Sequence, residues 1–377
     1  MSSPVTGQDA TGASSPSLPL SDRVPRSRVI LASLVGTTIE FYDFYVYATA
    51  AVAVFPALFF AGEDETAKLL ASMATFAAAF VARPIGSVIF GHFGDRIGRK
   101  ATLIGALLTM GVATFLIGLL PTYYQIGLWA PALLTILRFC QGLGLGGEWS
   151  GAALLATETA KEGKRAWAAM WPQLGAPIGF LLANGLFLIL TLAFNHDSTN
   201  PDMDGPFLTW VWRLPFLLSI LMVAIGMYVR VRLQETPVFR RAVENDERVK
   251  APLGEVFRKN WWELILGTFI MLATYVLFYL MTTFTLSYGT AAKSVDDAAA
   301  AAAAAGKDFD PSAFTAGLGY ARNDFLLMLI IGVVFFGIFT MVAGPLAEKF
   351  GRRTTLIWVS LGIVAFGFLW VPLFGGG

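Results

Sequence analysis

Five charged side chains interrupt long apolar segments of this 377-residue chain: Glu40, Asp43, Arg83, Arg138 and Glu148. An ionised side chain in the middle of a membrane costs about 2.5–3.5 kcal/mol on insertion scales, so each needs a partner or a water-filled cavity. Carboxylates and guanidinium groups in such places can carry protons, form ion pairs or bind charged solutes. The sequence therefore predicts proton or ion-pair chemistry within a membrane.

The depths of these charges suggest two pairs. At about 1.5 Å per residue, Asp43 and Arg138 fall at similar heights in the outer half of a core about 30 Å thick. Arg83 and Glu148 each fall about 12–14 Å above the inner boundary. We predict that Asp43 carries a proton beside Arg138, with Glu40, one helical turn away, as the alternative carrier. We interpret Arg83–Glu148 as a structural ion pair, and a permanent structural pair is the alternative for Asp43–Arg138 as well.

Nine apolar segments, which include these charges, are each long enough to cross a bilayer as a helix. The chain is 56% hydrophobic and 14% charged, whereas soluble domains are about 45–50% apolar and about 25% charged. About 20 residues of helix cross the membrane core. The segments are 29–59, 66–91, 101–120, 127–157, 167–194, 208–231, 262–288, 324–346 and 354–374. The pattern predicts an all-α polytopic membrane protein.

Most Lys and Arg residues gather in the connections on one side of these segments. The other side holds only Lys68, Lys293, Lys307 and Arg322. Because basic connections stay inside the cell, we expect a multi-pass protein of the cell membrane with a cytoplasmic N-terminus.

Composition divides the chain into four parts. We expect a disordered cytoplasmic tail over 1–27, a six-helix bundle over 28–231 and a charged cytoplasmic linker over 232–260. The last part, 261–377, contains three spans and an Ala-rich external loop at 289–323. We interpret the Ala-rich tract as a tolerated low-complexity insertion.

Several classes of protein are disfavoured by composition. A net charge of +1 leaves no basic face for nucleic acid. Cys140 is the single cysteine, and the two histidines, His92 and His196, are far apart in sequence. The sequence contains no phosphate-binding Walker loop and no arguable Ser–His–Asp set. We therefore expect no metal ion, no cofactor and no enzymatic activity.

Two short basic loops share one design, Gly-x-x-x-acid-base-x-Gly-base-base. The first contributes Gly91, Asp95, Arg96, Gly98, Arg99 and Lys100, and the second contributes Gly344, Glu348, Lys349, Gly351, Arg352 and Arg353. One such loop is explained as a basic inner turn. Two at corresponding places indicate a chain of two related halves, as in many transporters, and we interpret them as gating loops.

With this repeat, the sequence resembles the major facilitator superfamily, whose signature loop joins helices 2 and 3 and recurs between helices 8 and 9. Arg138–Gly142 resembles the helix-4 motif of this superfamily. Other segments resemble its metabolite:proton symporter family: Glu40–Tyr47, Arg83–Gly86, Gly91–Lys100, Gln141–Trp149 and Trp212–Phe216. The resemblance implies two bundles of six helices. This chain has six spans before the linker and three after it, so we expect an incomplete C-terminal bundle, nine helices of twelve, in a fragment or a truncated gene product.

The resemblance and the buried charges together predict a proton-coupled symporter that imports a small organic solute by alternating access. An organic acid is favoured because Arg138 can hold a carboxylate by two hydrogen bonds. Other candidate contacts to the solute are Gln141, Gln173, Asn184, Tyr275 and Tyr279. We expect a monomer in the lipid bilayer. The alternatives are a proline- or betaine-like osmolyte symporter, a transport-dead membrane receptor and an exporter.

Overall fold

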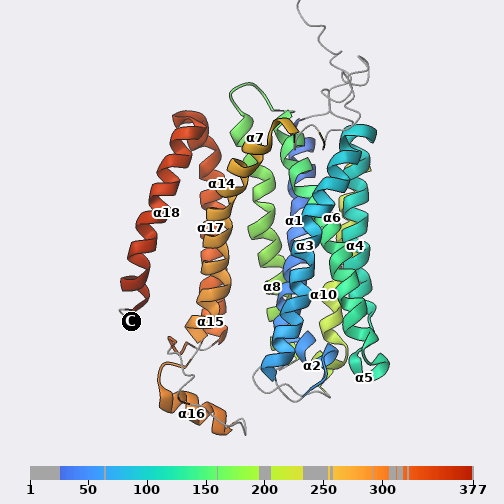
Figure 1. Cartoon of the computed structure of the whole chain (residues 1–377), viewed down its shortest axis with the longest axis vertical. Helices are drawn as coiled ribbons and strands as arrows, with labels where there is room; N and C mark the ends of the chain where they lie inside the picture. The colour runs from blue at the N-terminus through green and yellow to red at the C-terminus, as the bar shows by residue number, and fades with distance from the viewer. Residues whose placement is uncertain are drawn as a thin grey trace, which may run out of the picture.

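The computed structural model describes residues 26–62, 65–158, 160–194, 205–231, 254, 258–290, 292–304, 311, 317–320 and 322–375. Within these ranges the regular structure is helical, and no strand occurs. The long helices run side by side along the long axis of the molecule (Figure 1). Eight described helical stretches are long and apolar enough to cross a membrane. The prediction of an all-α polytopic fold is confirmed.

The first half begins with four long helices joined by short ones. They are α1 (Arg26–Ala53), α2 (Phe55–Phe59), α3 (Glu65–Ile97), α4 (Arg99–Leu119), α5 (Tyr123–Ile126) and α6 (Trp129–Glu158). The fifth predicted span is broken into α7 (Arg165–Gln173) and α8 (Gly175–Ala193). The sixth consists of α9 (Pro206–Thr209), η2 (Val211–Arg213), α10 (Leu214–Leu217) and α11 (Ser219–Val231).

Helix α1 lies at the centre of this half and contacts α3, α4, α6, α7, α8 and α11. Beyond the buried charges, its C-terminal end and α2 pack into an aromatic cluster of Tyr47, Phe55, Phe59, Trp212 and Phe216, all fully buried. The ring centroids of Tyr47 and Phe55 are 5.1 Å apart, and those of Phe55 and Trp212 are 6.0 Å apart. These rings fix the height of α1, and thus of its acidic residues.

Glycines bring the backbones of α3 and α6 into direct contact. A Cβ added at Gly146 would lie 2.0 Å from the carbonyl oxygen of Arg83, and one at Gly86 would lie 2.0 Å from that of Leu143. Small residues at helix interfaces in membranes allow this close approach. The contact places Arg83 and Arg138 beside α1 from two neighbouring helices.

The second half consists of α14 (Trp261–Tyr279), the π-helical η3 (Leu280–Phe284), α15 (Thr285–Thr290), α16 (Val295–Ala304), α17 (Arg322–Phe350) and α18 (Arg352–Gly375). The Ala-rich tract, which shows no amphipathic pattern, forms helix α16. Ser294 caps it by accepting a 3.1 Å hydrogen bond from the Asp297 backbone N–H and donating one of 2.7 Å to Asp297 Oδ2. Alanine's strong helix propensity and this cap explain the helix.

The two halves meet where α17 contacts α7 and α8. In Figure 1, α7 and the adjoining end of α17 lie at the top, while α15 and α16 lie away from α2 and α5 at the bottom. Residues 1–25 of the predicted tail and most of the linker 232–260 lie outside the described residues. Those two boundaries therefore stay predictions.

Candidate functional site

A cluster of polar side chains is buried halfway along α1, where the sequence predicted it. Glu40 and Asp43 are 0% exposed, and Arg138 and Gln141 of α6 are 1% exposed. Thr114 of α4 is also fully buried beside them. Three helices thus meet around charged groups in the middle of an apolar bundle, where every polar atom needs a partner.

Hydrogen bonds join Asp43 to Arg138 through two intermediates. Arg138 donates to the side-chain oxygen of Gln141. The Gln141 Nε2 donates to Thr114 Oγ1 at 2.8 Å and to the backbone oxygen of Asp43 at 3.2 Å. Thr114 Oγ1 in turn donates a 3.0 Å hydrogen bond to Asp43 Oδ2. We call Asp43, Thr114, Gln141 and Arg138 the relay. Sequence depth placed Asp43 and Arg138 at one height, and the structure connects them through Thr114 and Gln141. Thr114 was not predicted as a site residue, and the predicted pairing of Asp43 with Arg138 for proton transfer stays a prediction.

Aromatic rings surround the Arg138 guanidinium. Its Cζ lies 4.0 Å from the ring centroid of Tyr47, 4.6 Å from that of Phe76 and 5.4 Å from that of Phe44. A guanidinium over aromatic faces gains cation–π attraction, which is stronger away from water. The Tyr47 hydroxyl is itself held by Thr75 Oγ1 at 2.6 Å. The rings therefore help to keep a cation buried.

Arg83 and Glu40 form an ion pair that the sequence reasoning missed. Arg83 Nη2 lies 4.0 Å from Glu40 Oε1, with the Arg83 side chain 22% exposed. Three residues of α-helix turn the chain by about 300°, so Glu40 and Asp43 face different neighbours about 60° apart. This angle directs Glu40 toward α3 and Asp43 toward α4 and α6. The side chain of Glu148 lies outside the described residues, so the predicted Arg83–Glu148 pair stays a prediction.

The other predicted solute contacts are spread over three helices. Asn184 of α8 accepts a 2.9 Å hydrogen bond from Thr49 and donates one of 3.2 Å to the Phe180 carbonyl oxygen, so its amide joins α8 to α1. Gln173 is partly buried at the end of α7.

Tyr279 of α14 lies against Phe80 of α3, with ring centroids 6.1 Å apart. Both Tyr275 and Tyr279 lie within electrostatic range of Tyr45.

The two basic loops adopt the same turn, as their shared sequence predicted. Gly98 separates α3 from α4 with φ 107°, and Gly351 separates α17 from α18 with φ 86°. Positive φ favours glycine because it has no Cβ. In the first loop, Lys100 Nζ donates to the Val231 carbonyl oxygen at 2.6 Å. The side chains of Asp95 and Arg99 lie outside the described residues.

The second loop connects the two halves through Glu348. Its Oε1 accepts hydrogen bonds from the backbone N–H groups of Ala166 at 2.6 Å and Trp167 at 3.2 Å. These amides belong to the first turn of α7, where free N–H groups and the helix dipole favour a negative charge. One turn earlier, a Cβ at Gly344 would lie 2.6 Å from Met170 Sδ, so the helices touch closely. The repeated motif singled out Glu348, but its partner could not be read from the sequence.

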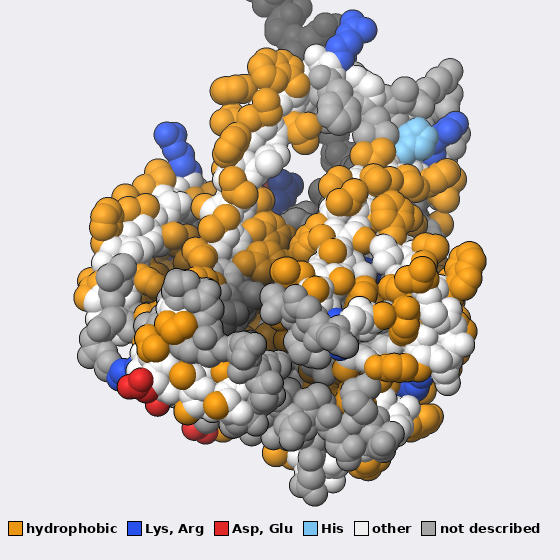
Figure 2. All heavy atoms as spheres, turned by 60° about the horizontal axis from the view of Figure 1, so that its bottom comes forward, with side chains coloured by type: hydrophobic (Ala, Val, Ile, Leu, Met, Phe, Trp, Pro, Cys, Tyr) orange, Lys and Arg blue, Asp and Glu red, His pale blue; other side chains and the backbone are white. Residues whose placement is uncertain are grey.

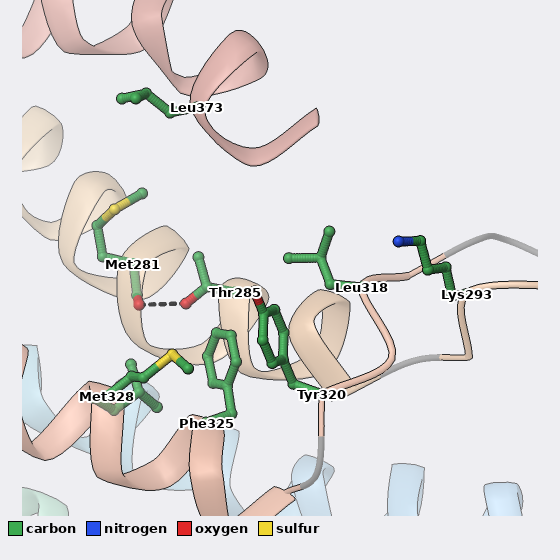
Figure 3. Close-up of a pocket in the computed structure, with 9 residues that line it drawn as sticks. Met281, Thr285, Lys293, Leu318, Tyr320, Phe325, Met328 and Leu373 are labelled. Atoms are coloured by element: carbon green, nitrogen blue, oxygen red, sulfur yellow. Dashed lines mark hydrogen bonds between the residues drawn. The ribbon is translucent and has the colours of Figure 1, made fainter. Parts of the chain in front are cut away.

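A separate pocket of about 340 Å³ lies in the second half (Figure 3). It is lined mainly by apolar side chains, with Thr285, Lys293 and Tyr320 as its polar members. The Thr285 hydroxyl donates to the Met281 carbonyl oxygen. None of the predicted site residues lines this pocket. Among the described residues, no group of three His, Cys, Asp or Glu side chains is arranged to hold a metal ion.

This fold and site define a multi-span membrane protein. Its first half contains the buried charges, and each half contains one of the two basic turns, at Gly98 and Gly351. Residues 29–264 match the family model described as "Sugar (and other) transporter". The chain belongs to this family, which lies within the major facilitator superfamily, and is a transport protein rather than an enzyme.

Its relatives carry metabolites. The chain is 52% identical to the inner membrane metabolite transport protein YhjE of Escherichia coli, over 93% of this chain and 74% of the relative. A putative metabolite transport protein of Haemophilus influenzae is 48% identical over 92% of this chain and 74% of its own length. The glycine betaine/proline/ectoine/pipecolic acid transporter OusA of Dickeya dadantii is 33% identical over 92% of this chain and 64% of its own length.

Solved structures agree on the fold. The proton:xylose symporter XylE matches with a TM-score of 0.57 and 18% identity, over 87% of this chain and 70% of the symporter. The chain is therefore a multi-pass membrane protein of the major facilitator fold.

Proposed function

We propose that this metabolite transporter is a proton-coupled symporter that imports a small organic acid by alternating access, as a monomer with its N-terminus in the cytoplasm. The observation that carries the proposal is the relay, which links a buried carboxylate to a buried guanidinium in the middle of the bundle. A permanently charged structural pair would not need a hydroxyl that can either donate to the carboxylate or accept from it. The relay contains such a hydroxyl.

Thr114 supplies that hydroxyl. Its oxygen lies 3.0 Å from both Asp43 Oδ2 and the Met110 carbonyl oxygen, and its hydroxyl has a single proton to donate. When Asp43 is ionised, Thr114 donates to the carboxylate. When Asp43 is protonated, the carboxyl can donate to Thr114, whose own proton then turns to Met110. The site thus keeps its hydrogen bonds in both protonation states, which a proton carrier requires. Glu40 remains the alternative carrier.

Alternating access needs a contact that closes one side and can be broken. The bonds from Glu348 to α7 close the end of the molecule that carries the basic loops. Figure 2 brings the opposite end forward and shows a hollow in the surface at that end. With the basic loops inside the cell, this conformation is open to the outside, and rocking of the halves would break the Glu348 contact.

An organic acid is favoured by chemistry and by the relatives. The relatives' names include shikimate, proline, glycine betaine, ectoine and pipecolic acid, each of which carries a carboxyl group. A carboxylate entering a membrane cavity needs a cation, and this bundle offers Arg83 and Arg138. Gln173, Asn184, Tyr275 and Tyr279 remain candidate contacts. The zwitterionic members of this set keep an osmolyte symporter as the second candidate.

Transport by the purified chain in lipid vesicles tests the proposal. Vesicles containing a pH-sensitive dye and a buffered interior receive radiolabelled shikimate or proline under an inward proton gradient. We expect uphill uptake of one solute, with solute-dependent acidification of the interior. Downhill flux without acidification would refute proton coupling. Binding without flux would refute transport and support the receptor alternative.

A further inference from the structure

We propose that Arg83 binds the carboxylate of the transported solute and that Glu40 is its exchangeable counter-ion. This inference rests on the proposed function and deepens it, because it assigns the group that selects organic acids. The juxtaposition that carries it is a partly exposed guanidinium 4.0 Å from a fully buried carboxylate, with Tyr279 of the second half within electrostatic range of Arg83.

Accessibility separates Arg83 from Arg138. Arg138 is 1% exposed, is packed against three aromatic rings and donates to Gln141, so a solute can reach it only after these groups move. The Arg83 side chain is 22% exposed although it lies near the middle of α3. A solute can reach a partly exposed cation halfway along a span more readily than a fully buried one. Arg138 then acts on the proton site rather than on the solute.

The Arg83–Glu40 distance leaves room for another anion. Charge-assisted hydrogen bonds between nitrogen and oxygen measure about 2.7–2.9 Å. Arg83 Nη2 and Glu40 Oε1 are 4.0 Å apart, which is close enough for an ion pair but too far for a hydrogen bond between these two atoms. A guanidinium presents five N–H donors in a planar fork that fits a carboxylate at two points. An incoming carboxylate can therefore form a stronger pair with Arg83 than Glu40 does.

The second half supplies the other wall of this site. Tyr279 lies against Phe80, one helical turn before Arg83, and both Tyr275 and Tyr279 lie in electrostatic range of the Tyr45 hydroxyl. Arg83 is in electrostatic range of both Tyr45 and Tyr279. A solute on Arg83 would thus touch both halves, and it could respond to their relative movement.

Exchange of partners would involve Glu40, the alternative carrier, in a protonation step separate from that of Asp43. When a carboxylate takes Arg83, Glu40 would exchange its ion pair with Arg83 for a proton, since an ionised group buried in an apolar bundle is costly. The proton would come from water on the open side and leave when the solute leaves. Among the described side chains, the other charged and titratable groups around the pair are Asp43 and Tyr45 on α1, Arg138 on α6, and Tyr275 and Tyr279 on α14.

The test measures binding to the purified full chain in detergent, without a proton gradient. The probes are shikimate and proline, each compared with its uncharged or cationic methyl ester, by titration calorimetry at pH 7.5. We expect one acid to bind and its ester to bind at least tenfold more weakly. Arg83→Gln should weaken binding of the acid by about 10- to 100-fold, since a hydrogen-bonded charge is lost. Arg83→Lys, which keeps the charge, should lose less.

Glu40→Gln distinguishes an exchangeable counter-ion from a structural ion pair. Removing the competing carboxylate should leave the affinity for the acid unchanged or increase it, whereas a structural pair predicts that Glu40→Gln and Arg83→Gln both weaken binding. Lys293→Gln is the matched control, because this cation lines the separate pocket. All variants must elute as the parent does in size exclusion and keep its helical circular dichroism.

Equal binding of acid and ester, binding of neither acid, or a loss that follows Lys293 instead of Arg83 would each overturn the assignment. Failure of the proposed function looks different. If the parent binds the acid through Arg83 but does not accumulate it under a proton gradient, the proposed transport is refuted and the carboxylate site stands.

Discussion

The contact between Glu348 and the first turn of α7 allows a quantitative test of gating. Glu348→Gln keeps an acceptor oxygen and nearly the same shape, so it isolates the effect of the negative charge. A charge at a helix N-terminus contributes about 0.3–1 kcal/mol, and up to about 2 kcal/mol where it is partly buried. Here one oxygen takes two N–H groups at 2.6 and 3.2 Å, within a partly buried contact, which favours the upper half of that range.

A loss of about 1–2 kcal/mol converts to about a 5- to 30-fold rise in the population with the basic side open. Met170 provides the reporter, because it is buried at this interface next to Gly344. In a parent carrying Cys140→Ser and Met170→Cys, a water-soluble maleimide should label position 170 only when the halves separate. When opening is fast compared with labelling, the rate follows the open population. We expect Glu348→Gln to raise that rate 5- to 30-fold.

Glu263→Gln is the control, because this carboxylate lies in the first turn of α14 and is exposed. It should change the rate by less than about twofold, since exposed charges contribute little. If Glu348→Gln is labelled as slowly as the parent, the charge on Glu348 does not hold the two halves together. Equal acceleration by Glu263→Gln would point instead to a general effect of net charge.

Three further variants test the site and its packing. Asp43→Asn should abolish uphill uptake driven by a proton gradient, because it removes the exchangeable proton; undiminished accumulation in vesicles would remove Asp43 from the mechanism. Thr114→Val should slow coupled uptake about tenfold while Thr114→Ser stays near the parent, since only the hydroxyl links Asp43 to Gln141; equal rates would show that the relay is dispensable. Gly146→Ala should lower the free energy of unfolding by about 1–3 kcal/mol through overpacking. Gly185→Ala, with nothing within 4 Å of its added Cβ, should not; equal thermal unfolding midpoints in detergent would contradict the close α3–α6 contact.

Depth along a span could be predicted from the sequence, and rotation about it could not. Counting residues placed Asp43 and Arg138 at one height, and the structure joins them by hydrogen bonds. The same count matched Arg83 with Glu148 and did not indicate the ion pair with Glu40. That pair depends on how each helix is rotated about its axis. Thr114 was missed for the same reason: a lone Thr in an apolar span has no local signal of a distant carboxylate.

The sequence by itself determined the spans, the basic turns with their glycines, and the requirement that five intramembrane charges find partners. These follow from local properties: apolar length, the fixed rise of a helix, and the need for glycine at positive φ. Only the tertiary structure decided the partners, including Glu40 for Arg83 and the α7 amides for Glu348. The reason is that packing between helices far apart in the chain, such as the contact of Gly146 with Arg83, sets the direction of every side chain.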